Sequence, residues 1–210
     1  MRRCMFLVVL VVASTALWAQ TATIREFSGK VEYRLNEADA WTTVRAGLQI
    51  PVNTTVSTGF NSRAVLVVNG SVIEVAALTR LTIEELAANA GGTSTGVFVP
   101  VGRVRATVDR DERLSTDFRV RTAQSTAAVR GTVFETNGWQ IWVSEGIVEF
   151  TNLLGQGRTV GATEISVITD GGPSYPFTEL FDQGNPGGSG SPGGRRPVSH
   201  ASFITVEWGD

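Results

Sequence analysis

Metal and nucleophile chemistry depends on residue types that this chain scarcely contains. The 210 residues include one histidine, His200, and one cysteine, Cys4. Metalloenzymes built on jelly-rolls commonly hold their ion with two or three histidines and a carboxylate, and a nucleophilic serine needs a nearby base. His200 lies in a tail rich in glycine and proline, where a histidine is ordinarily just solvated. The sequence therefore predicts no metal, no cofactor and no histidine-based catalysis.

Paired carboxylates are the remaining route to acid and base catalysis, as in glycoside hydrolases. The candidates are Glu84 and Glu85, the group Asp109, Asp111 and Glu112, and Glu145. All of them fall in segments that the pattern predicts as turns, where carboxylates are usually solvated. We therefore expect a protein that is not an enzyme.

Three tryptophans, Trp41, Trp139 and Trp142, are candidates for stacking against a sugar ring. Trp139 and Trp142 are predicted on one strand with opposite parity. A regular strand would turn at most one of them outward and place the other in the core. Trp139 and Trp142 are therefore the candidate surface binding residues, and one of the two is expected to be exposed.

Two arginines stand beside small residues within otherwise apolar strands. Arg63 and Arg130 have two alternative roles: each guanidinium reaches a turn carboxylate or backbone carbonyls and fixes the strands, or each binds a ligand. The structural role is favoured, because an arginine fork that satisfies several carbonyls is a common way to complete a β-roll.

The elements that must position these residues are short strands. From Thr23 onward apolar and polar residues alternate, with turn residues at intervals of roughly ten. Asn69-Gly70 predicts a type I′ hairpin and Asn137-Gly138 a second one, whereas Glu84 to Ala88 is predicted as a loop with at most a short helical turn. We expect an all-β single domain, either a jelly-roll-like β-sandwich or a double-stranded β-helix.

The chain begins with a pattern typical of a secretory signal peptide. Arg2 and Arg3 precede an apolar run, and small residues lead to Ala19, after which we expect cleavage. Residues 1–19 are thus predicted as a signal peptide and the mature protein as periplasmic or extracellular. Removal of the two arginines leaves 16 Lys and Arg against 20 Asp and Glu, a net charge of −4. A mildly acidic chain without a basic block argues against nucleic acid as a partner.

Composition divides the rest of the mature chain. Residues 20–172 form the predicted β domain, and residues 173–201 form a linker of glycine, serine and proline that buries too little apolar surface to fold alone. Residues 202–210 alternate again like a strand. Whether this segment pairs within its own chain or with another copy stays open.

Several motifs resemble the FecR domain family. They are Phe118-Arg119-Val120-Arg121-Thr122, the segment Ala127 to Phe134 with its Val-Arg-Gly-Thr-x-Phe core, the segment Thr58 to Ala64, the Asn69-Gly70 hairpin, and Val143 to Val148 around Gly146. The resemblance implies structural roles for the motif positions Gly59, Ser62, Arg63, Asn69, Gly70, Arg130, Gly131, Thr132, Phe134 and Gly146.

The resemblance also implies an exported all-β module that serves as a sensing or interaction platform. The family's iron-transport regulators carry a cytoplasmic helical segment that acts on a sigma factor, but here only Met1 to Met5 precede the apolar run. We therefore expect a non-enzymatic protein-interaction or sensing module whose partner is another envelope protein. The alternatives are a glycan- or peptidoglycan-binding module and a structural envelope component with an exchangeable C-terminal strand.

Overall fold

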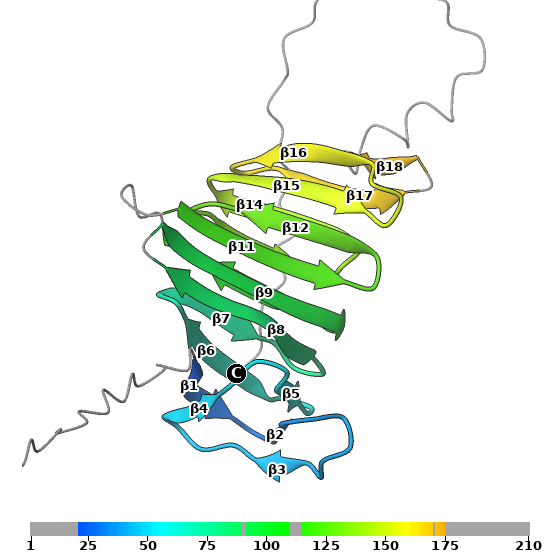
Figure 1. The fold of residues 1–210 in the computed structure, drawn as a ribbon. Coiled ribbons are helices and arrows are strands. Elements are labelled where there is room, and N and C mark those ends of the chain that lie inside the picture. Colours follow the sequence, from blue (N-terminus) through cyan, green and yellow to red (C-terminus); the bar gives the residue numbers. More distant parts are fainter. Residues whose placement is uncertain (1–20, 90, 110–114, 170, 175–210) are drawn as a thin grey trace, which may run out of the picture. The chain divides into compact units, whose positions relative to one another are not determined.

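The computed structural model describes residues 21–89, 91–109, 115–169 and 171–174, and in this part of the chain the fold is all-β (Figure 1). Two sheets of nine strands each contain all the described strands. Sheet A has the order β18 (Gly172–Ser174), β17 (Ile165–Thr169), β14 (Gln140–Glu145), β13 (Val133–Thr136), β10 (Val104–Thr107), β7 (Ser71–Val75), β6 (Arg63–Val68), β1 (Ala22–Ser28), β4 (Leu48–Ile50). Sheet B has the order β16 (Gly157–Gly161), β15 (Ile147–Asn152), β12 (Ser125–Val129), β11 (Ser115–Thr122), β9 (Gly92–Val101), β8 (Arg80–Asn89), β5 (Thr55–Thr58), β2 (Val31–Arg34), β3 (Thr42–Thr43).

The chain builds the two sheets together by passing repeatedly from one to the other. The hairpins β6–β7, β13–β14 and β17–β18 belong to sheet A, and the hairpins β8–β9, β11–β12 and β15–β16 belong to sheet B, so both sheets grow in nearly the order of the sequence (Figure 1). Strands β9 and β11 are parallel, because the chain visits β10 of sheet A between them, and the other described pairs are antiparallel. The predicted all-β class is confirmed, and the arrangement is compatible with a jelly-roll-like sandwich or a double-stranded β-helix.

Both predicted hairpins form, with different turns. Asn69 and Gly70 have φ values of 47° and 82°, as a type I′ turn requires. At Asn137-Gly138 the connection is one residue longer, and the side-chain Oδ1 of Asn137 accepts hydrogen bonds from the backbone N–H groups of Trp139 and Gln140. An Asx turn therefore replaces the expected two-residue turn.

The segment from Glu84 to Ala88 is a strand, so its prediction as a loop was wrong. It lies inside β8, which pairs with β9. The register shifts between Ile83 and Glu85, and this bulge leaves Glu84 and Glu85 both exposed on neighbouring positions. Because the bulge interrupts the alternation of inward and outward residues, the sequence loses the periodicity that indicates a strand.

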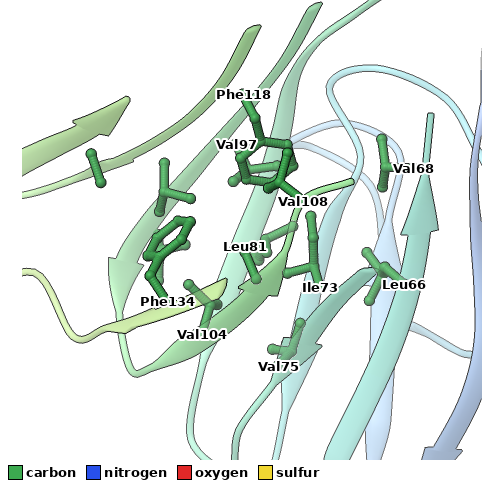
Figure 2. Close-up of a cluster of buried hydrophobic side chains, with 14 of the residues drawn as sticks. Leu66, Val68, Ile73, Val75, Leu81, Val97, Val104, Val108, Phe118 and Phe134 are labelled. Carbon is green, nitrogen blue, oxygen red and sulfur yellow. The ribbon is translucent and has the colours of Figure 1, made fainter. Parts of the chain in front are cut away.

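The core lies between the two sheets and is almost entirely aliphatic and aromatic. Phe118 and Val97 of sheet B lie close to Val108, and Leu81, Ile73 and Phe134 lie beside them in the same cluster (Figure 2). All but Val108 in this group are fully buried. Burial of side chains this large contributes about 1.5–3 kcal/mol each to folding.

We call a segment in which the chain passes from one sheet to the other a crossing. Neighbouring crossings are joined by hydrogen bonds of buried hydroxyl groups. The Oγ of Ser62, between β5 and β6, accepts a 2.8 Å hydrogen bond from the N–H of Lys30, between β1 and β2. The Oγ1 of Thr79, between β7 and β8, accepts a 3.0 Å bond from the N–H of Arg103, between β9 and β10. Each hydroxyl thus satisfies a backbone donor on the neighbouring crossing. We call these interactions corner contacts.

A third corner contact lies within the Val-Arg-Gly-Thr-x-Phe motif. The Oγ1 of Thr132 donates a 3.0 Å hydrogen bond to the carbonyl of Ile147, where the chain enters sheet B after Gly146. A Cβ at Gly146 would lie 2.7 Å from the carbonyl oxygen of Gly131 and 2.8 Å from Thr132 Oγ1. Gly146 also has a φ of 83°, so both its backbone conformation and its surroundings require glycine.

The described fold ends at Ser174 in β18, two residues beyond the predicted domain boundary. The predicted signal peptide, most of the linker, His200 and the strand-like segment 202–210 lie outside the described residues. Within the described residues, no helix is long and apolar enough to cross a membrane.

Replacement of Gly146 by alanine should destabilise the protein by about 3 kcal/mol or more, because a left-handed backbone strain of about 1–2 kcal/mol is joined by a steric clash. Gly155 is the matched control, since its φ is 79° but nothing lies within 4 Å of its Cβ position. Gly155→Ala should therefore cost only the backbone strain. Urea unfolding of both variants gives the comparison, and equal losses would show that the close approach at Gly146 is unimportant.

Candidate binding surfaces

Most of the family-motif positions belong to the framework. Ser62 and Thr132 make corner contacts, and Phe134 is fully buried in the core. The side chain of Asn69 leaves its turn in sheet A and donates a 3.0 Å hydrogen bond to Thr95 Oγ1 on β9 of sheet B. The backbone N–H of Gly59 donates a 2.8 Å bond to the carbonyl of Lys30. These residues therefore hold the two sheets together.

The two motif arginines, for which a structural role was favoured, are both exposed. Arg63 is exposed and lies 3.7 Å from a carboxylate oxygen of Glu26, which is also exposed, so the pair is solvent-screened. Arg130 is exposed too, and its guanidinium contacts no carboxylate or carbonyl among the described residues. The structural importance of the motif lies instead in Gly131 and Thr132, which approach Gly146.

Trp139 and Trp142 are both exposed, at 58% and 43% of their surface. The prediction that one of them would be buried was wrong, because Trp139 precedes β14 and lies in the turn, where strand parity does not apply. On β14 the inward positions are Ile141 and Val143, and Trp142 points to the outer face of sheet A.

Trp142 stands in an outward row of sheet A. Its strand neighbours are Glu135 on β13 and the half-buried Ile165 on β17. Glu135 in turn forms a 3.3 Å ion pair with Arg103. The aromatic ring therefore lies between an apolar neighbour and a charged one, a mixture that is common at protein interfaces.

Trp41 does not belong to the same surface. It adjoins β3 at the edge of sheet B, whereas Trp142 lies on sheet A. The guanidinium carbons of Arg34 and Arg80 lie 4.9 and 5.7 Å from the centre of the Trp41 ring. The three tryptophans therefore form no single sugar-stacking platform.

Of the candidate carboxylates, Glu84 and Glu85 are engaged in surface interactions, and Glu145 is exposed at the end of β14. Glu84 forms an ion pair with Arg121 on β11, and the hydrogen bond to Glu84 raises the pKa of Arg121. Glu85 accepts a 2.6 Å hydrogen bond from Ser94 Oγ. In the part of the chain that the structure describes, no group of three His, Cys, Asp or Glu residues could hold a metal ion. Asp111 and Glu112 lie outside that part.

A polar groove on sheet B was missed by the sequence analysis. It has a volume of about 550 Å³ and is lined by residues of β2, β5, β8 and β9, among them Arg34, Arg80, Thr82 and Phe98. The outward parity of Arg34 and Arg80 was available from the sequence. Their proximity was not, because it depends on β5 lying between β2 and β8 in the sheet.

Comparison with known protein families gives a match to part of this chain. The model of the FecR protein family matches residues 54–149, which run from just before β5 into β15. The chain therefore carries a FecR domain, and the family predicted from its motifs is confirmed.

Two crystal structures of a candidate anti-sigma factor from Parabacteroides distasonis ATCC 8503, at 2.50 and 1.65 Å resolution, match over part of their length. Each is 20% identical, with a TM-score of 0.47, and the match covers 55% of this chain and 54% of theirs. The chain thus spans about half the length of these structures. No curated protein matches it.

Thr132→Val should reduce the free energy of unfolding by about 1–2 kcal/mol, because it removes the hydroxyl that donates to the Ile147 carbonyl while preserving the shape of the side chain. Arg130→Ala should change that free energy by less than about 0.5 kcal/mol, as expected for an exposed side chain. Urea melts of the two variants test the assignment. A larger loss for Arg130→Ala than for Thr132→Val would contradict it.

Proposed function

We propose that this protein is an exported, non-enzymatic FecR-domain module that acts by binding another protein of the cell envelope. The observation that carries the proposal is the exposure of two large aromatic side chains, Trp139 and Trp142, at 58% and 43% of their surface. Large aromatic side chains contribute disproportionately to protein interfaces. The family match supports a sensing or regulatory role.

Export is supported by the order of basic, apolar and small residues at the start of the chain. Expression of the full chain in a bacterial host should give a mature protein that begins at or near Gln20. Intact-mass spectrometry of the protein from the periplasm or medium measures this. A secreted pool that retains Met1 would refute cleavage, and accumulation in the cytoplasm would refute export.

If the exposed aromatic rings bind the partner, their removal should weaken partner binding without reducing the stability of the fold. Trp142→Ala should weaken capture of the envelope partner by about 2 kcal/mol or more, as for an interface hot spot, and leave the unfolding midpoint within error of wild type. In vivo crosslinking followed by mass spectrometry identifies the partner and measures its recovery. Leu154→Ala is the matched control, since Leu154 is 80% exposed in the loop between β15 and β16 of sheet B. Undiminished recovery with Trp142→Ala would exclude this surface.

A glycan-binding module is the second candidate, and the same two exposed rings favour it, because aromatic faces stack on sugars. Sedimentation with purified cell-wall sacculi separates the two functions. Retention of the wild type on sacculi, with loss for Trp139→Ala or Trp142→Ala, would support glycan binding instead. Recovery of a crosslinked protein without retention on sacculi would support the protein-binding function.

A further inference from the structure

The arginines of sheet B fall into two groups. Five lie on its strands: Arg34, Arg80, Arg119, Arg121 and Arg158. Three of them form ion pairs, Arg119 with Asp117, Arg121 with Glu84 and Arg158 with Glu164. Within the described residues, Arg34 and Arg80 have no carboxylate within 4 Å.

These two unpaired arginines meet at one place. Both guanidinium groups contact the ring of Trp41, at 4.9 Å for Arg34 and 5.7 Å for Arg80. Stacking on an aromatic ring restricts the rotation of a long side chain, so less freedom is lost when the guanidinium binds a ligand. Trp41 thus lies close to both positive charges.

The loop after β2 fixes one of these arginines further. Nη1 of Arg34 donates a 2.8 Å hydrogen bond to the backbone carbonyl of Glu37. The loop is itself closed by Asn36 and Asp39, whose side chain accepts two 3.0 Å bonds from Asn36. Arg34 is therefore held through a neutral carbonyl, which leaves its charge uncompensated.

The surface between these arginines is a groove lined by both polar and apolar side chains. Thr55 and Thr82 share a 2.9 Å hydroxyl hydrogen bond, and Phe98 and Pro100 supply apolar surface next to them. Two carboxylates, Glu37 and Glu84, also line the groove, but Glu84 is already neutralised by Arg121. The volume of about 550 Å³ is of the size that binds several residues of an extended chain or a small molecule.

We propose that this groove binds an acidic, extended peptide segment of a protein partner, with Arg34 and Arg80 receiving its carboxylates and Phe98 and Pro100 contacting its aliphatic atoms. Guanidinium groups match carboxylates in shape and charge, and these two are the strand arginines of sheet B that form no ion pair among the described residues. Trp41 acts as a positioning residue. The inference rests on the proposed protein-binding function and names the chemistry of the partner.

Fluorescence anisotropy with a labelled short peptide of alternating Glu and Thr tests the proposal directly, using the folded mature chain. The matched probe replaces each Glu by Gln. We expect saturable binding of the Glu peptide, binding of the Gln peptide weaker by about tenfold or more, and loss of the difference at high salt. Equal binding of both peptides would overturn the role of charge.

Variants assign the binding to the groove. Arg34→Gln and Arg80→Gln should each weaken binding of the Glu peptide about tenfold, and the double variant should abolish it. Arg119→Gln is the matched control, because Arg119 lies on the same sheet but is paired with Asp117, and it should bind like wild type. Trp41→Leu should weaken binding while preserving its salt dependence. Unaltered binding by the double variant would refute the site.

Two further measurements separate this inference from the proposed function. An acidic polysaccharide, polygalacturonate, should compete poorly with the Glu peptide. If the protein bound the polysaccharide but not the Glu peptide, the peptide assignment would be overturned. Envelope crosslinking with the Arg34→Gln/Arg80→Gln variant should recover less partner than wild type. Full recovery would refute the groove while leaving the protein-binding function intact, whereas a wild type that recovers no partner would refute the function itself.

Discussion

The fold depends on satisfying the backbone where the chain passes from one sheet to the other. Each crossing leaves the hydrogen-bond ladder, and a buried amide or carbonyl without a partner costs about 1–3 kcal/mol. Ser62, Thr79 and Thr132 solve this with a hydroxyl that reaches the next crossing. Because each contact joins segments that are distant in the sequence, the crossings stack on one another and bring the sheets into a fixed relation.

This constraint explains why the family motif has its composition. A hydroxyl in close contact with the next crossing leaves no room for a side chain there, and Gly146 beside Thr132 is the clearest case. Phe134 then follows as the first large core residue after the corner, fully buried between the sheets. The Gly-Thr-x-Phe sequence is thus a corner followed by core packing, and the exposed Arg130 ahead of it lies outside both roles.

The same architecture leaves the outer faces available. Along each strand, side chains alternate between the core and the outer face of the sheet. Trp142 on sheet A and Arg34 and Arg80 on sheet B therefore lie outside the core. The bulge in β8 adds to this by exposing both Glu84 and Glu85 and allowing Glu84 to neutralise Arg121. Differences between the two outer faces therefore arise from side chains that the core does not constrain.

Local sequence determined the strand character, the Asn69-Gly70 turn and the corner motifs, because periodicity, positive φ and close backbone approach are properties of a few neighbouring residues. Only the tertiary structure decided which outward side chains meet. Trp41 contacts Arg34 and Arg80 through the pairing of β2, β5 and β8, and Trp139 is exposed because the strand starts one residue after it. Neither fact is contained in an alternating pattern, since sheet order and strand ends are set by long-range pairing.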